Sequence, residues 1–134
     1  MTPAEARAAV VGHFVSQWAN RTPIDHVEDA RATPPAPFVR VAVQHDGGLA
    51  QSWTGPTIHW ARFGIVNVQV IVPGGKGTAD ADALANAAVQ ILEGRRFAGG
   101  LRLGASTVQD VGRDEFGNMI MVVATSFEYT DSHA

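Results

Sequence analysis

The apolar residues near the start of the chain recur at the spacing of one helix face. Just ahead of them, Thr2-Pro3-Ala4-Glu5 has the pattern of a capping box, with proline at the first helical position. The pattern therefore predicts a helix from residue 3 to about residue 20. The residues expected on its buried face are Val10, Val11, Phe14, Val15 and Trp18.

Two later stretches alternate between apolar and polar positions, which is typical of half-buried strands. Valines occupy every second position over residues 39–43 and again over residues 66–72. We expect strands at 38–45 and 60–72. Residues 46–59 between them contain glycines and polar residues without this alternation. They are predicted to form a long, flexible hairpin loop.

A second helical pattern follows the turn at residues 73–75. Thr78 or Asp80 is its expected cap, since small polar side chains favour that position and acids in the first turn suit the helix dipole. Gly94 is expected to end it, and Phe97 to fold back onto the core. The predicted buried stripe consists of Leu84, Ala88, Ile91 and Leu92.

Two more strands are predicted at residues 101–111 and 119–129, joined by a turn at 113–118. The first is weaker, with Gly104 as a candidate bulge and with Leu101, Leu103, Ala105 and Thr107 expected on one face. The second is partly apolar on both faces. That pattern indicates a central strand, or one whose second face is covered by a partner.

The predicted order α-β-β-α-β-β indicates an α+β fold with a mainly antiparallel four-stranded sheet and two helices packed on one face. The 134 residues fit a single domain, 1–134. The proline-rich residues 22–37 are expected to connect its parts. Phe63, Ile65 and Ile71 are expected on the sheet face away from the helices, and a monomer rarely leaves a large apolar patch bare.

Composition narrows the classes of function. There is no cysteine, and the formal net charge is −3. A thiol nucleophile and a thiolate metal site are therefore excluded. The sequence has no basic stripe, which argues against a sequence-reading nucleic-acid module. No apolar stretch approaches the roughly 20 residues that span a bilayer, so no membrane partner is expected.

Each candidate for site chemistry has a simpler structural interpretation, which we prefer. His45, Asp46 and His59 could meet across the hairpin and hold a metal, but ordinary loop histidines explain them. Residues 72–78 have Gly-Lys just before a predicted helix, as a phosphate-binding loop does, but they lack the Walker A spacing. A strand-to-helix turn with a capping threonine explains them. The acids around the last hairpin lack an apolar pocket that would raise a pKa. These acids are Asp110, Asp114, Glu115, Glu128 and Asp131. We expect no catalytic residue, metal or cofactor.

Trp53 and Trp60 flank the predicted loop. Aromatic side chains in a solvent-facing loop are candidate anchors for a protein interface. The alternative is that one or both fold back over the sheet edge. A loop of this length between two strands is unusual, and long loops often carry function.

The middle and end of the chain resemble a known family. The strand at 60–72 leads into Val-Ile-Val-Pro-Gly-Gly-Lys-Gly-Thr, the Asp/Ala-rich helix ends in Ile-Leu-Glu-Gly-Arg-Arg-Phe, and the last strand closes on Phe-Glu-Tyr. This pattern resembles the tail terminator (tail completion) proteins of long-tailed bacteriophages and of phage-like gene transfer agents. The first helix, the proline-rich connector and the strand at 38–45 also match their layout.

The resemblance implies a structural virion protein rather than an enzyme. Such proteins assemble in the host cytoplasm into hexameric rings that cap the tail tube, stop addition of the tail tube protein and present a surface to the head-side connector protein. DNA passes through without specific binding, which the acidic charge suits. The resemblance places Asp46, Gly47, Gly48, Trp53 and Trp60 against a tail or a neighbouring subunit. It assigns ring packing to the second sheet face, through Asn67, Gln69 and Glu128.

Two alternatives stay open at this point. The chain could be a head–tail joining protein of the same particle, a role that binding to purified portal complexes rather than tail tubes would distinguish. It could also be a small enzyme or ligand-binding α+β domain. That reading requires a closed pocket with converging polar groups.

Overall fold

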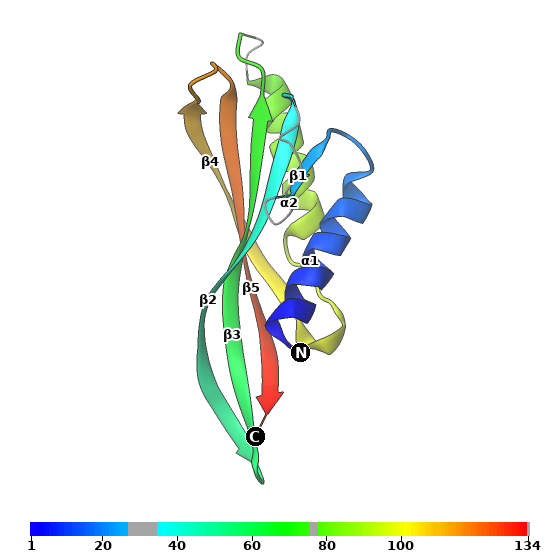
Figure 1. Ribbon diagram of the computed structural model, residues 1–134, viewed down its shortest axis with the longest axis vertical. Helices are drawn as coiled ribbons and strands as arrows, with labels where there is room; N and C mark the ends of the chain where they lie inside the picture. The colour runs from blue at the N-terminus through cyan, green and yellow to red at the C-terminus, as the bar shows by residue number, and fades with distance from the viewer. Residues whose placement is uncertain (27–34, 76–77, 134) are drawn as a thin grey trace.

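The computed structural model describes residues 1–26, 35–75 and 78–133. A long, twisted sheet carries both helices on one side (Figure 1). The strand order across the sheet is β1-β2-β3-β5-β4. The elements are α1 (Pro3–Trp18), β1 (Ile24–His26), β2 (Phe38–Thr54), β3 (Thr57–Val72), α2 (Ala79–Leu92), the short 3₁₀ helix η1 (Ala98–Gly100), β4 (Arg102–Arg113) and β5 (Met119–His133).

The α+β class is confirmed, but the sheet has five strands rather than the predicted four. The additional strand, β1, lies within the proline-rich residues 22–37 and pairs parallel to β2, with Ile24 opposite Val39. All other strand pairs are antiparallel. Three residues are too few to show an alternating pattern, so no strand was predicted there. Residues 27–34 of the expected connector lie outside the described residues.

Helix α1 begins at the predicted capping box. The Thr2 hydroxyl accepts from the Glu5 N–H at 3.2 Å, and the Thr2 N–H donates to Glu5 Oε1 at 3.1 Å. The helix ends at Trp18, followed by Ala19 and Asn20 with positive φ. Its buried residues are Ala6, Val10, Phe14 and Trp18. Val15, expected on that face, is partly exposed because the buried stripe is narrower than predicted.

Helix α2 packs beside α1 over the same sheet face. Thr78 is the N-cap residue, but its side chain makes no capping hydrogen bond. Phe97 folds back onto the core, as expected, and meets the His13 ring edge-on at 5.0 Å. The helix buries Ala81, Ala85, Ala88, Ile91 and Leu92. Because three of these are alanines, the helix axis approaches the valine-rich sheet closely.

The core is formed by the predicted strand faces. Val39, Val41 and Val43 of β2 pack beside Val66 to Val72 of β3, and both groups lie beneath the helices. In β4 the register shifts between Leu103 and Ser106, around the candidate bulge at Gly104. Ser106 therefore turns toward the core, where its hydroxyl lies 2.7 Å from the buried Thr125 hydroxyl. The shared face predicted for Ala105 and Thr107 is wrong for this reason, since both are exposed.

The prediction of a long flexible loop at residues 46–59 is also wrong. Strands β2 and β3 stay paired to the tip, from Gly47 opposite Phe63 to Thr54 opposite Thr57, and only Gly55 and Pro56 form the turn. The register shifts between His45 and Gly47 and again between Ala50 and Ser52. Each bulge breaks the period of two, which removed the strand signal from the sequence. We call residues 46–63 the arm.

Gly64 sits where the arm joins the core, and its lack of a side chain is a packing requirement. A Cβ there would lie 2.3 Å from Phe127 Cζ and 2.5 Å from Gln44 O. We expect Gly64→Ala to destabilise the fold by about 1–3 kcal/mol through overpacking, as measured by urea denaturation. The control is Gly12→Ala in α1, where nothing lies within 4 Å. It should stabilise by about 0.5–1 kcal/mol, and an equal effect of both substitutions would contradict the packing argument.

Candidate assembly surface

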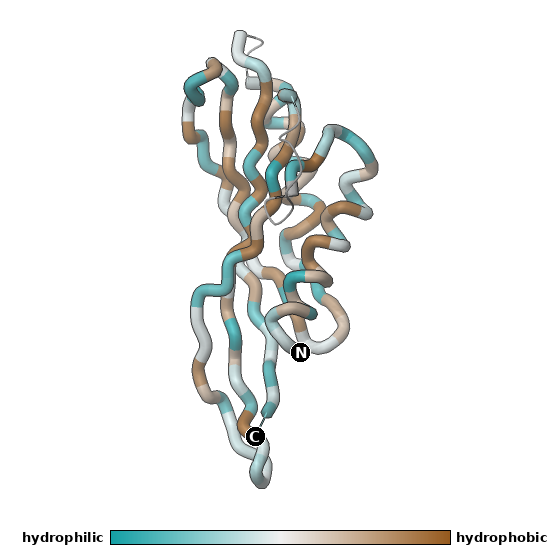
Figure 2. The backbone as a smooth tube through the Cα atoms, viewed as in Figure 1, coloured by the Kyte–Doolittle hydropathy of each residue, from teal (hydrophilic) through white to brown (hydrophobic). Residues whose placement is uncertain are grey.

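The arm extends beyond the helices, as a ribbon of β2 and β3 flanked by the end of β5 (Figure 1). Figure 2 shows the apolar residues concentrated higher up, between sheet and helices, while the arm is mostly polar with isolated apolar positions. Two of those positions are strongly exposed: Leu49 at 57% and Trp53 at 66%. Neither face of the arm tip is covered by a helix.

The two tryptophans behave differently although they lie on the same strand face, since Trp53 pairs with Ile58 and residues 58 and 60 share a face. Trp53 projects into solvent near the tip. Trp60 stacks on His133 with ring centroids 5.9 Å apart, and the Arg62 guanidinium lies 5.5 Å from its ring centroid. Trp53 therefore remains a candidate anchor, whereas Trp60 is folded onto the arm.

The sheet face away from the helices places Asn67 and Gln69 at its centre. Arg40 donates to Gln69 Oε1 at 3.1 Å and forms an ion pair with Asp25 of β1 at 2.9 Å. A shallow hollow of about 470 Å³ lies around these side chains, with Val122 on its border. Gln69 is thus held in a fixed hydrogen-bonded network, and Asn67 is the freer of the two predicted contact residues.

A second hollow, of about 480 Å³, opens lower on the same face, where the arm begins. Phe63 and Ile65 form its apolar wall, and the ion pair of Glu128 with Arg102 borders it. The hollow exists because two facing residues are small: a Cβ on Gly104 would lie 2.7 Å from Ser126 Oγ. Asp46, at the first bulge, also lines it.

The eight predicted contact residues therefore fall into two groups. Asp46, Gly47, Gly48, Trp53 and Trp60 lie on the arm, and Asn67, Gln69 and Glu128 lie on the open sheet face. Gly47 and Gly48 are strand residues opposite Phe63 and Arg62, not loop residues.

The candidate metal set is not brought together. His45 pairs opposite Gly64 at the base of the arm, while His59 pairs opposite Ser52 further along it and its ring nitrogens lie 2.7 Å from Ser132 Oγ and 3.1 Å from Thr54 Oγ1. Over residues 1–26, 35–75 and 78–133, no three His, Cys, Asp or Glu side chains group as metal ligands would.

The acids of the last hairpin are dispersed in the same way. Asp114 accepts backbone hydrogen bonds from Phe116 and Asn118 within the β4–β5 turn, and those bonds oppose the effect of burial and leave its pKa lowered. Glu128 and Asp131 instead pair with different arginines, far along β5. Lys76 and Gly77 of the Gly-Lys segment lie outside the described residues.

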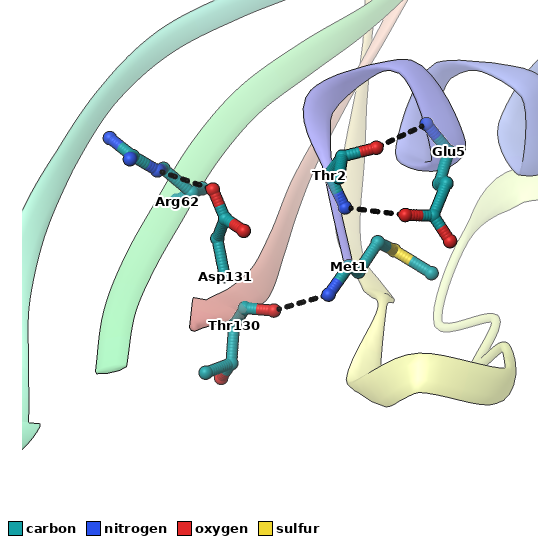
Figure 3. A network of polar contacts seen from close by, with 6 residues as sticks. All are labelled: Met1, Thr2, Glu5, Arg62, Thr130 and Asp131. Carbon is teal, nitrogen blue, oxygen red and sulfur yellow. Dashed lines mark hydrogen bonds and ion pairs between the residues drawn. The ribbon is translucent and has the colours of Figure 1, made fainter. Parts of the chain in front are cut away.

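One group of side chains was not predicted from the sequence. His45, Arg62 and Tyr129 lie together at the base of the arm. Arg62 lies opposite Tyr129 across β3 and β5, and the His45 and Tyr129 ring centroids are 6.3 Å apart. Figure 3 shows how the start of α1 is held beside this place: the Met1 ammonium donates to Thr130 O at 3.3 Å, next to the Arg62–Asp131 pair. These residues come from three strands that are distant in the sequence, so no spacing pattern could predict that they meet.

Burial at this position lowers the pKa of His45 below its ordinary 6.5, helped by the positive charge of Arg7 and opposed by a backbone hydrogen bond with Pro3. Because folding favours the neutral ring, its contribution to stability is fully present above pH about 6.5 and is lost as pH falls through the lowered pKa. We expect the urea midpoint to fall between pH 7 and pH 5, and to fall less in His45→Gln. His59→Gln on the arm is the control and should keep the wild-type loss. An unchanged loss in His45→Gln would refute this assignment.

Comparison with known proteins gives a fold and no family. No protein family and no curated protein sequence matches the chain. One solved structure, of a protein whose name states no function, aligns over 100% of this chain and 99% of its own length, with a TM-score of 0.64 and 17% sequence identity. The two proteins share a fold. At that identity the likeness says nothing further about what this chain binds.

Within the part of the chain that the structure describes, no helix combines sufficient length with sufficient apolar character to cross a bilayer.

Proposed function

We propose that this chain is a structural assembly protein of the tail terminator type. In this proposal, copies of the chain form a ring that caps a phage-like tail tube, stops its growth and offers a surface to the head-side connector. The ring number expected from the resemblance is six. The proposed role needs no catalytic group, and the chain would act in the virion tail after assembly in the host cytoplasm.

The observation that carries the proposal is the arm. A narrow strand ribbon outside the core gains little stability by itself, yet this one holds Leu49 and Trp53 in solvent. Among the described residues, β1 pairs with residues 39–41 of β2, and no described strand pairs with the outer edge of β2 along the arm. Free edges and exposed aromatic residues both favour association with another chain.

A second exposed group supports assembly through two different surfaces. Phe116 in the β4–β5 turn is 81% exposed and Val111 beside it 58%. This turn and the arm tip lie at opposite ends of the molecule (Figure 1). Contacts between unlike surfaces produce rings when the rotation closes, whereas a shared single patch produces a dimer.

Particles assembled without this protein provide the test. Negative-stain images should show overlong tails, or tails without heads. Tails of normal length joined to heads would contradict the proposal. Binding of the purified chain to tail tubes rather than to portal complexes would separate the terminator role from that of a head–tail joining protein.

A ligand-binding role is the second candidate, and the lower hollow is what favours it. Phe63 and Ile65 offer an apolar wall, and Arg102 and Glu128 offer charged groups at the border. A metabolite that raises the melting temperature of the wild type, but not of Phe63→Ala, would support this role over assembly.

A further inference from the structure

The arm base contains a buried hydroxyl with no protein acceptor. Tyr129 is only 3% exposed, and among the described residues its Oη has no hydrogen-bond partner. Burial is the main reason that the pKa of Tyr129 is raised, so the hydroxyl keeps its proton at neutral pH. It is therefore a buried hydrogen-bond donor without an acceptor among the described residues.

Further donors lie around this hydroxyl. Arg62 Nε lies 3.6 Å from Asp131 Oδ2, which is an ion-pair distance but too long for a hydrogen bond. The Trp60 indole nitrogen is also buried without a hydrogen-bond partner in the described part of the chain. Tyr129 of β5 and Arg62 and Trp60 of β3 thus present three N–H or O–H donors on one face of the sheet.

Charges of both signs act at this place. Asp131 acts on Tyr129 with negative charge, Arg62 and Arg7 act on it with positive charge, and Arg7 also acts on His45. Arg7 comes from α1, and its Nη2 donates to Val43 O at 3.1 Å. Two arginines, from β3 and α1, and one carboxylate, from β5, therefore lie near Tyr129.

A buried donor that finds no acceptor destabilises the fold, so several in one place call for a group that accepts from all of them. An oxyanion has several acceptor oxygens and carries the charge that two arginines favour. We propose that Trp60, Arg62 and Tyr129 form an oxyanion site at the base of the arm. Its occupant is either a free phosphate-like ion or the carboxylate of a neighbouring copy, and this second source rests on the proposed ring assembly.

Phosphate binding to the isolated chain tests the site. Inorganic phosphate is titrated at constant ionic strength, with chloride as the replaced ion, while NMR follows the Trp60 indole and Arg62 Nε–H signals. We expect saturable shifts with a Kd in the millimolar range. Arg62→Met should weaken binding at least tenfold, and Tyr129→Phe, which removes only the hydroxyl, at least threefold.

Arg21→Met is the control. Arg21 is an exposed arginine just beyond the end of α1 that lies away from the arm, and it donates to the Gln17 and Trp18 carbonyls. It should keep the wild-type Kd within twofold. Shifts that do not saturate, or that Arg62→Met leaves unchanged, would show that the donors are met by water only and would overturn the proposal.

The effect of phosphate on the assembled mass then distinguishes a free ion from a neighbour's carboxylate as the occupant of the site. If a neighbour's carboxylate fills the site, 100 mM phosphate should shift the ring toward monomer at constant ionic strength, in the wild type and in Arg21→Met. If a free ion fills it, phosphate should leave the assembled mass unchanged or stabilise it; both results support the site. A chain that binds phosphate but never assembles would refute the proposed function and leave the site standing.

Discussion

Val68→Asp should leave the chain unfolded. Val68 is fully buried at the centre of the sheet, between Val41 of β2 and Val123 of β5. A carboxylate there has no partner and no water, and an uncompensated buried charge costs several kcal/mol. That loss is comparable to the whole stability of a small domain. Circular dichroism should show loss of the native spectrum, with no cooperative urea transition.

The control for this substitution is Gln69→Glu, one residue along the same strand. It adds the same charge, but on the open sheet face beside Arg40. We expect its stability to stay within about 1 kcal/mol of the wild type. Equal damage from both substitutions would mean that β3 is not oriented as described.

Trp53→Ala should impair assembly while the monomer stays folded. The side chain is 66% exposed and contacts no core residue, so its removal should change the free energy of unfolding by less than about 0.5 kcal/mol. As an interface anchor it should contribute about 2 kcal/mol to association. That value corresponds to a roughly 30-fold higher concentration for half-assembly, measured by sedimentation velocity.

Val15→Ala serves as the control for Trp53→Ala, because Val15 is an exposed apolar residue on α1, away from the arm. It should assemble at the wild-type concentration. A Trp53→Ala chain that loses monomer stability but assembles normally would show that Trp53 is a packing residue.

The sequence predicted the parts of the fold that obey a regular period. The capping box, the two helices and the valine faces of β2 and β3 were all predicted from spacing and were found in place. They were predictable because one face of each element is buried against one core. The spacing of the apolar residues then shows whether the element is a helix or a strand.

The arm was not predictable from the same rule, because neither of its faces is buried and two bulges interrupt its register. Without a buried face, nothing selects alternating apolar residues, and Gly47 and Gly48 then resemble a loop. The Tyr129 cluster was missed for another reason. Its members, His45, Arg62 and Tyr129, are far apart in the sequence, and the register of β2, β3 and β5 brings them together.

Amide hydrogen exchange in the arm, measured together with the mass of the assembled particle, tests whether another copy of the chain covers residues 46–63, as we propose. At concentrations where a ring-sized mass forms, amides on the free edge of β2 between Gly47 and Thr54 should exchange at least tenfold more slowly than in dilute monomer. If the chain stays monomeric at the highest concentration and exchange in the arm is unchanged, the arm is not an assembly surface between copies of the chain.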